Sequence, residues 1–254
     1  MLKNSDPIYL SWQSLDDRGW HVVGRLVRDE LGYVFNYTKG VLKAKKFLPF
    51  SGMDELATTY RSASLFPLFQ NRVLSPKRPE YPRFIKWLGL TESQADPLEI
   101  LARSEGHRAT DWLQTFKRIT EDSQGRFVHY FLVHGIRHLS VSALDRVNKL
   151  SVGERLCLML DCQNQLDRRA IVVRAENPAE IVGYCPRYIV NDLHNRLVCE
   201  PGSLEVAVET FAPDAPTYYK LMCKLVGKPC RVSATESQER FDEYDLVTCS
   251  DGVC

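Results

Sequence analysis

Several polar side chains that could bind phosphates or bases stand where short apolar runs of this chain end. They fall in three segments, residues 133–138 (VHGIRH), 161–170 (DCQNQLDRRA) and 182–188 (VGYCPRY). Arginines at such turns can neutralise phosphates, and aromatic faces can stack on bases. Each residue by itself also has a structural explanation: Asp167 could cap its own turn, and Tyr184 could belong to the core. The chemistry that the three segments share is recognition of nucleic acid rather than catalysis.

The sequence matches none of the common catalytic or metal-binding templates. Its only Gly-Lys pair, Gly227-Lys228, lacks the upstream glycine and the following Ser or Thr of a phosphate-binding loop. There is no G-x-S-x-G, H-E-x-x-H or kinase catalytic-loop pattern. Residues 161–172 differ from a calcium loop, because no glycine stands at position six and Val172 replaces the glutamate of position twelve. We expect a non-enzymatic protein that needs no metal and no cofactor, with an unrecognised hydrolase as the remaining alternative.

The cysteines and the apolar runs bear on the compartment. Eight cysteines are scattered over residues 157–254 without a C-x-x-C pair, which argues against a zinc ribbon or a redox pair. We expect them to be reduced and to serve as small hydrophobic side chains, as Cys223 would between Leu221 and Leu225. The sequence lacks the pattern of a secretory signal and any run of about 18 apolar residues. We therefore expect a cytoplasmic protein with no membrane partner.

The net charge of +1 hides an uneven distribution. Residues 236–254 contain six acidic residues and one arginine, so the rest of the chain is mildly basic. A basic surface permits a phosphate-bearing partner without requiring one, since such an excess is common on ordinary proteins. The acidic segment 236–254 has no periodic apolar face, and we expect it to be a disordered tail.

The turns that carry the polar segments belong to a β-rich second half, which begins after the polar stretch 120–125. Alternating or β-branched apolar residues predict strands there, and two segments with one apolar face predict helices. The expected strands are 127–133, 156–160, 170–173, 181–184, 204–208 and 221–225, and the expected helices are 143–150 and 188–197. Six short strands and two short helices favour a small, closed or nearly closed β-barrel. We assign residues 126–235 to this domain.

The first half combines strands with short helices, so the whole chain is predicted to be α+β. The expected strands are 9–12, 20–27 and 33–37, and the expected helices are 82–88 and 96–106. In the last of these, Asp96 can cap the free amides and Pro97 fits the first helical position. Gly106 can take the left-handed conformation that ends a helix. We assign residues 1–122 to a small N-terminal domain of strands and short helices.

Taken in order, the polar segments and the runs between them resemble the HIRAN domain family over about residues 126–228. The shared patterns are G-I-R-H at 135–138, G-E-R-L-x-L at 153–158, D-x-x-N-x-x-D-x-x-A-I-x-V at 161–173 and I-V-G-Y-x-P-R at 181–187. The resemblance implies an OB-like barrel that binds single-stranded DNA or DNA ends. In DNA translocases that remodel replication forks, this domain holds the 3′ end of a single strand, which would place the chain in DNA repair.

By position, the resemblance implies a set of DNA-binding residues: Arg137, His138, Asn164, Leu166, Asp167, Tyr184, Arg187 and Phe211. Arg137 and Arg187 would contact phosphates. Asp167 would accept a hydrogen bond from the terminal 3′ hydroxyl, and His138 and Tyr184 would lie beside the terminal bases. The resemblance therefore implies a site that recognises the end of a single strand.

The chain departs from the family pattern at two stacking positions. The family commonly has N-P-Y-D where this chain has residues 164–167 (NQLD), so Leu166 replaces a tyrosine on which a base stacks. His138 stands at another stacking position in place of tyrosine, while Phe211 would still lie close to the stacked base. Stacking of a base on an aromatic ring contributes about 1–3 kcal/mol. We therefore expect weaker binding than in the translocases.

A second resemblance links about residues 9–110 to the N-terminal subdomain of HipA-type toxin kinases. The similar segments are 23–26 (VGRL), 32–37 (GYVFNY), 65–74 (LFPLFQNRVL) and 96–101 (DPLEIL). The kinase core is missing, so phosphotransfer is not implied, and a generic α+β packing domain is the plainer alternative. If residues 65–69 are exposed, as they would be beside a missing core, they would bind a protein partner. The alternative function is thus a regulatory module that partners a HipA-like kinase or a DNA-processing enzyme.

Overall fold

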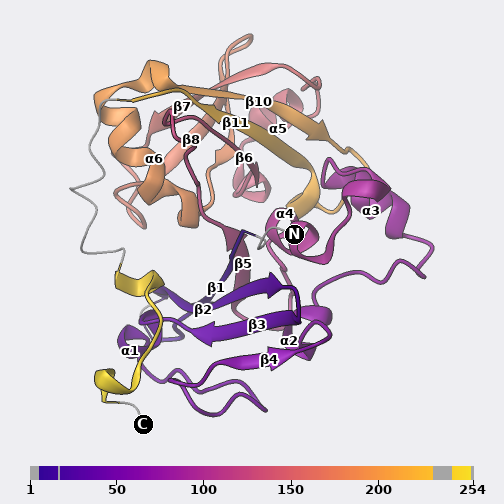
Figure 1. The fold of residues 1–254 in the computed structure, drawn as a ribbon. Coiled ribbons are helices and arrows are strands. Elements are labelled where there is room, and N and C mark those ends of the chain that lie inside the picture. Colours follow the sequence, from indigo (N-terminus) through magenta and orange to yellow (C-terminus); the bar gives the residue numbers. More distant parts are fainter. Residues whose placement is uncertain (1–5, 17, 231–241, 253–254) are drawn as a thin grey trace. The chain divides into compact units, whose positions relative to one another are not determined.

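The computed structural model describes residues 6–16, 18–230 and 242–252. The chain divides into two compact units (Figure 1). The first comprises residues 1–75, 96–118 and 234–254, and the second comprises residues 76–95 and 119–233. Each unit has its own antiparallel sheet and its own hydrophobic core, which fits the predicted α+β class.

The first unit is built on a five-stranded sheet with the strand order β4-β3-β2-β1-β5. Its strands are β1 (Ile8–Gln13), β2 (Trp20–Asp29), β3 (Gly32–Tyr37), β4 (Tyr60–Ser62) and β5 (Leu113–Lys117), and its α-helices are α1 (Gly40–Lys43), α2 (Pro67–Gln70) and α4 (Pro97–Ser104). Strand β1 lies between β2 and β5. A strand near the start of the chain therefore pairs with β5, which belongs to the unit's second segment, residues 96–118. The predicted strands at 9–12, 20–27 and 33–37 are confirmed.

Helix α4 has the ends that its sequence predicts. The Asp96 carboxylate accepts a hydrogen bond from the Leu98 amide at 2.9 Å, and Pro97 is the first helical residue. At the other end both Glu105 and Gly106 have positive φ, at 58° and 53°. The helix therefore begins as predicted, and its left-handed exit involves one residue more than the predicted glycine.

The apolar segment 65–69 does not form the exposed patch that its resemblance suggested. Phe69 is fully buried, and Phe66 also belongs to the core of the first unit. Their rings pack around Phe35, at centroid distances of 6.3 Å for Phe66 and 5.8 Å for Phe69. The expectation of an exposed interface at these residues is wrong because the unit's own sheet supplies the apolar surface that covers them.

The described part of the acidic tail, residues 242–252, is ordered against the first unit. It contains the 3₁₀ helices η6 (Asp242–Tyr244) and η7 (Cys249–Asp251). Val247 is only 6% exposed and its amide donates to the Tyr37 carbonyl at 3.1 Å. For residues 242–252 the expectation of disorder is wrong, because this segment pairs with the backbone at the end of β3. Cys249 is disulfide-bonded, so the expectation that every cysteine is reduced fails there.

The second unit contains a six-stranded antiparallel sheet with the order β6-β11-β10-β7-β8-β9. Its strands are β6 (Phe127–Leu132), β7 (Arg155–Leu160), β8 (Ile171–Ala175), β9 (Glu180–Tyr184), β10 (Leu204–Phe211) and β11 (Leu221–Gly227), its α-helices are α3 (Tyr81–Trp87), α5 (Val141–Val147) and α6 (Arg187–Cys199), and its 3₁₀ helices are η1 (Glu92–Gln94), η2 (Ile136–His138), η3 (Pro201–Ser203) and η4 (Thr217–Tyr219). Helix α6 packs against β7, and α5 packs against β9. The six strands and both helices predicted for the second half are present.

Of the predicted closed or nearly closed barrel, the closed form is not seen. Strands β6 and β9 are the two edges of the sheet, and their ends meet at one isolated antiparallel bridge between His134 and Tyr184. Just beyond this bridge Gly135 takes a left-handed conformation with φ of 77°, and Pro186 follows the end of β9. Because the chain turns away on both sides, the two edge strands cannot pair along their length.

Helix α3 belongs to the second unit, although the sequence places it in the first half. The Thr210 hydroxyl on β10 donates to the Trp87 carbonyl at 2.9 Å, and the Phe84 ring meets the Tyr219 ring edge-on at 5.5 Å. The structural division therefore differs from the predicted domains 1–122 and 126–235. The cause is this long-range packing, which joins residues 76–95 to a domain that begins more than twenty residues later in the chain.

Small buried side chains complete the core of the second unit. Cys223 and Cys185 both lie in it, and burial raises the pKa of each thiol. Cys223 therefore has the predicted role of a small hydrophobic side chain. Among the described residues, no helix combines the length and the hydropathy that crossing a membrane requires. Within the same residues no cluster of His, Cys, Asp or Glu is suited to hold a metal ion.

Candidate nucleic-acid interface

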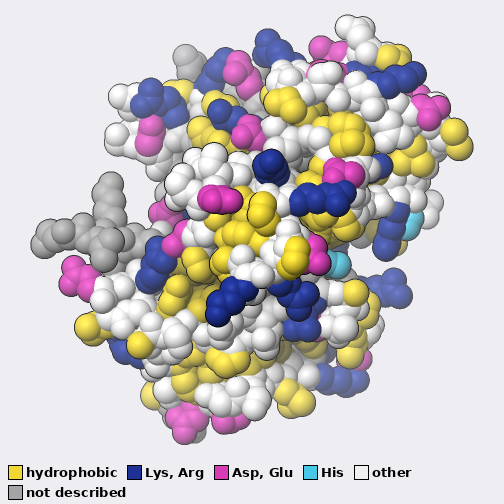
Figure 2. Space-filling view, turned by 90° about the vertical axis from the view of Figure 1, so that its right-hand side faces the viewer, with side chains coloured by type: hydrophobic (Ala, Val, Ile, Leu, Met, Phe, Trp, Pro, Cys, Tyr) yellow, Lys and Arg dark blue, Asp and Glu magenta, His cyan; other side chains and the backbone are white. Residues whose placement is uncertain are grey.

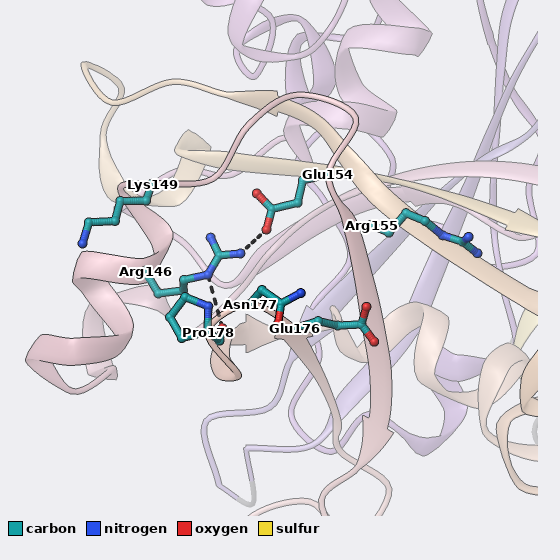
Figure 3. A pocket seen from close by; sticks show the side chains of 7 residues that line it. All are labelled: Arg146, Lys149, Glu154, Arg155, Glu176, Asn177 and Pro178. Atoms are coloured by element: carbon teal, nitrogen blue, oxygen red, sulfur yellow. Dashed lines mark hydrogen bonds and ion pairs between the residues drawn. The ribbon is translucent and has the colours of Figure 1, made fainter.

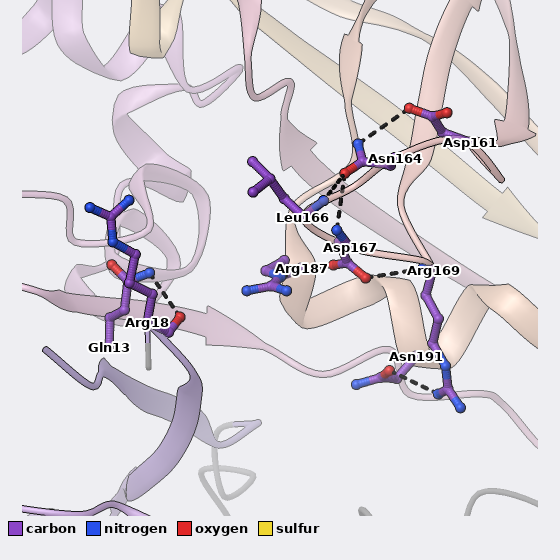
Figure 4. A network of polar contacts seen from close by, with 9 residues as sticks. All are labelled: Gln13, Arg18, Asp161, Asn164, Leu166, Asp167, Arg169, Arg187 and Asn191. Carbon is purple, nitrogen blue, oxygen red and sulfur yellow. Dashed lines mark hydrogen bonds and ion pairs between the residues drawn. The ribbon is translucent and has the colours of Figure 1, made fainter. Parts of the chain in front are cut away.

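The loop between β7 and β8, residues 161–170, is shaped by the side chain of Asn164. Its amide oxygen accepts hydrogen bonds from the backbone amides of Leu166 and Asp167, both at 3.0 Å. Its amide nitrogen donates to the Asp161 carboxylate at 3.2 Å (Figure 4). An asparagine side chain that accepts from the amides two and three residues ahead stabilises a turn, because it replaces the backbone carbonyl that would otherwise accept those bonds. Asn164 therefore positions the loop and turns its own polar atoms inward.

Asp167 joins this loop to the start of α6. One carboxylate oxygen accepts from the Arg169 amide at 3.0 Å, and the other accepts from the Arg187 Nε at 2.8 Å (Figure 4). Arg187 is the first residue of α6 and follows Pro186, whose fixed backbone suits the entry to a helix. The Arg187 side chain is 50% exposed. The ion pair thus holds an arginine at the surface of the loop with its remaining donors accessible.

Tyr184 connects the end of β9 to the same loop. Its hydroxyl donates to the Asp161 carboxylate at 3.1 Å, so Asp161 binds both Tyr184 and Asn164. Burial and the hydrogen bond to Asp161 raise the pKa of Tyr184, which keeps the phenol protonated as a donor. The interaction of Asp161 with both residues was not foreseen from the sequence, although Asp161 opens the D-x-x-N-x-x-D pattern.

Arg137 and His138 lie on η2, immediately after the bridge between His134 and Tyr184. Both side chains are exposed, and the Arg137 Nε donates to the His138 Nε2 at 2.9 Å. The His134 and Tyr184 backbones exchange two hydrogen bonds of 2.9 Å, and η2 packs against β9. The structure therefore brings the segment 133–138 beside the end of β9.

The remaining predicted residues differ in their placement. Leu166 is 93% exposed at the tip of the loop. Phe211 pairs with Leu221 at the end of β10 and packs against the hydrophobic core, outside the polar network of Figure 4. Arg168 is exposed, whereas the Arg169 guanidinium donates to Asn191 on α6 at 3.4 Å. Stacking on Leu166 would lack an aromatic ring. Phe211 lies outside the network, as do Arg137 and His138, which bond to each other on η2.

A hollow in the second unit lies at the opposite ends of β7 and β8 from this loop (Figure 3). It is lined by Arg146, Lys149, Glu154, Arg155, Glu176, Asn177 and Pro178. The Arg146 guanidinium is nearly buried, bonded to Glu154, and its Nε donates to the Pro178 carbonyl at 3.3 Å. Because acidic side chains face its cations, the hollow does not offer a purely basic surface. Its position separates it from the Asp167 and Arg187 pair.

Comparison with known proteins identifies the domain that holds this site. The family model of the HIRAN domain matches residues 127–229, from the start of β6 to just beyond β11. No curated protein matched the chain. The resemblance of the first half to HipA-type kinases remains a prediction.

Two solved structures are similar to part of the chain. One is the crystal structure of a protein from Lactobacillus plantarum, with 21% identity, coverage of 41% of this chain and 99% of that chain, and a TM-score of 0.31. The other is the HIRAN domain of human HLTF, with 17% identity, coverage of 48% of this chain and 92% of that chain, and a TM-score of 0.32.

Proposed function

We propose that the HIRAN domain formed by residues 127–229 binds single-stranded DNA and holds its 3′ end, without catalysing a reaction. The HIRAN domain is a DNA-binding module, and the strand type and the end are the proposed part. The observation that carries the proposal is the Asp167–Arg187 pair, an acceptor and a cation held together at the surface by the loop and α6. A phosphate and a neighbouring hydroxyl group are what such a pair would recognise.

Asp167 offers a carboxylate to a DNA end. Its two oxygens accept hydrogen bonds from the Arg169 amide and from the Arg187 Nε, so the carboxylate is fixed in place. An ionised carboxylate has about four acceptor positions and can accept from several donors at once. A terminal 3′ hydroxyl could donate to it, whereas a 3′ phosphate would bring negative charge against the carboxylate. This difference supports recognition of a free 3′ end.

Arg187 and Arg137 supply the charge that a DNA backbone requires. The Arg187 Nε is directed to Asp167, which leaves the two terminal nitrogens of a half-exposed guanidinium for phosphate. Arg137 is exposed on η2, which packs beside the end of β9. Both arginines lie on elements that adjoin the end of β9, and two cations placed there support a site for one strand.

The test compares a free 3′ hydroxyl with a 3′ phosphate on otherwise identical single strands, using the full chain. We expect the wild-type protein to bind the hydroxyl end about tenfold more tightly, the effect of about 1.4 kcal/mol that one hydrogen bond to a charged group provides. Asp167→Ala should abolish this preference. Asp145→Ala, which removes an exposed carboxylate from α5, is the matched control and should keep it. Retention of the preference in Asp167→Ala would contradict the assigned role.

The proposal for the first unit is less specific. We keep a protein partner for it, as a regulatory module would have, but residues 65–69 cannot form the contact because Phe66 and Phe69 are buried. We also propose a cytoplasmic location for the chain. To test for such a partner, the proteins that co-purify with the wild-type chain are compared with those that co-purify with a chain that lacks the exposed loops of the first unit.

A further inference from the structure

Helix α3 adds an aromatic surface to the HIRAN domain from outside the residues that match the family. The Trp87 ring stacks on the Tyr219 ring of η4, with the centroids 6.4 Å apart and the planes at 18°. The Trp87 carbonyl is fixed to Thr210 on β10, and Phe84 anchors the helix underneath against Tyr219. Trp87 and Tyr219 remain partly exposed, whereas Phe84 is buried. The Phe84 ring therefore holds helix α3 in place, and the Trp87 ring is presented at the surface.

This aromatic surface continues to the candidate site. The Tyr219 ring meets the Tyr218 ring at 5.2 Å, and the Tyr218 ring lies 5.6 Å from the His134 ring. His134 is the residue that bridges to Tyr184 at the end of β9. In addition, η4 packs against η2, which carries Arg137. A continuous series of rings therefore leads from His134, beside the end of β9, to Trp87.

Cations accompany the rings on α3. The Arg83 guanidinium lies 5.3 Å from the centre of the Trp87 ring and pairs with Asp214. The side chains of that pair are 57% and 49% exposed, and an exposed ion pair contributes only about 0–1 kcal/mol, so a phosphate can replace the carboxylate at little cost. Lys86 is also exposed on this helix. Figure 2, turned so that the side on which Figure 1 draws α3 faces the viewer, shows hydrophobic, basic and acidic side chains interspersed.

We propose that α3 and η4 form a second contact surface for the same single strand, which binds nucleotides on the 5′ side of the held 3′ end. Trp87 and Tyr219 would stack on bases, and Arg83 and Lys86 would contact phosphates. Rings that alternate with cations are the composition of grooves that bind single strands without sequence preference. This inference rests on the proposed function, because the 3′ end must be held for the strand to cross η4 toward α3.

The experiment measures binding of the full chain to 5′-labelled oligo(dT) of about 4 and about 16 nucleotides, the range of lengths that single-strand sites cover. Trp87→Ala should weaken binding of the longer strand about tenfold and leave the shorter strand unaffected, since loss of one stacked base is the expected change. A double variant, Arg83→Gln with Lys86→Gln, should make the log–log salt slope for the longer strand shallower by about 1.4, the value for two phosphates of a single strand. Arg155→Gln, whose side chain is 79% exposed at the far end of β7, should change neither quantity.

The outcomes separate this inference from the function on which it rests. If the wild-type chain binds both strands and Trp87→Ala binds the longer one as tightly, the second surface is wrong and the end-binding site stands. If the wild-type chain binds neither strand, both are wrong. The Arg83 and Lys86 variant changes exposed side chains and keeps the contacts of Trp87 with Tyr219 and Thr210, so an unchanged salt slope would contradict the inference even if Trp87→Ala fails to fold.

Discussion

At the scale of single residues, the exposed loop tip between β7 and β8 is the feature that limits binding. Leu166 is 93% exposed, so it contributes little to the stability of the domain. Asn164 fixes the backbone amide of Leu166, and the side chain therefore projects from a held turn rather than a free one. A fixed aliphatic side chain offers a small apolar contact but no ring for a base. The position is suited to substitution because no packing is lost.

Leu166→Tyr should tighten binding of single-stranded DNA about fivefold, which corresponds to about 1 kcal/mol from one stacked base. Fluorescence anisotropy with a 5′-labelled strand measures the change. Val152→Tyr, at another loop position that is 71% exposed, is the control for a non-specific effect of an added ring. Equal tightening by both variants would mean that Leu166 has no special place in the site.

Tyr184 gives a pH dependence that can be measured without DNA. Because its pKa is raised in the folded protein, mainly by burial and then by the bond to Asp161, folding favours the protonated phenol. This stabilising contribution is complete below the ordinary tyrosine pKa of about 10 and is lost as the pH rises through the higher folded value. The free energy of unfolding of wild type should therefore exceed that of Tyr184→Phe by about 1 kcal/mol at neutral pH, and the difference should shrink above about pH 10. A difference that is constant up to pH 11 would contradict this assignment.

At the scale of elements, short-range sequence patterns predicted individual strands and the start of a helix, but they did not predict how the edges of the sheet meet. The alternation of Leu221, Cys223 and Leu225 correctly predicted a strand with one buried face, and Asp96 correctly predicted the start of α4. The closed barrel was wrong because closure depends on how the ends of β6 and β9 meet, and periodicity does not report the conformation of Gly135 beyond that meeting point. Of the predicted site residues, the loop and α6 residues come together, whereas Phe211 lies outside their network.

The contact between the ends of β6 and β9 depends on Gly183. Its φ is 145°, and a Cβ atom there would lie 2.3 Å from Val133 Cγ1 and 2.6 Å from the His134 carbonyl oxygen. Gly183→Ala should therefore destabilise the domain by more than the about 1–3 kcal/mol of backbone strain alone, and it should weaken DNA binding by displacing η2. Chemical denaturation and anisotropy measure the two effects. Gly153→Ala, with φ of 82° and no atom within 4 Å of the added Cβ, has the strain without the clash and should be milder. Equal losses in the two variants would show that the contact with Val133 and His134 is unimportant.

At the scale of the whole molecule, each compact unit is completed by a segment distant in sequence. Residues 76–95 join the second unit through Trp87 and Phe84, and residues 242–252 join the first through Val247. The sequence did not reveal either arrangement, because the division was placed at a polar stretch and the tail has too few apolar residues to show a periodic face. Both depend on partners that are far away in the chain, such as Thr210 for Trp87 and Tyr37 for Val247.

Truncation after residue 235 tests whether the acidic segment stabilises the first unit. Loss of the buried Val247 alone should cost about 1.5–3 kcal/mol, and the Tyr244 ring, 4.8 Å from the Tyr9 ring, adds to this. We expect a lower denaturation midpoint for the first unit and unchanged affinity for short single strands. An unchanged midpoint would show that residues 242–252 do not contribute to stability.

The central claim, that Arg137 and Arg187 hold the phosphates of a single strand, is tested most directly by the salt dependence of binding. The affinity of the full chain for a 5′-labelled single strand is measured over a range of salt concentrations in wild type and in a double variant, Arg137→Gln with Arg187→Gln. We predict a log–log slope of about −1.5 to −3 for wild type, as expected for neutralisation of two to four phosphates, and a slope shallower by about 1.4 in the variant. Binding that does not depend on salt, or a slope that is the same in both proteins, would contradict the account.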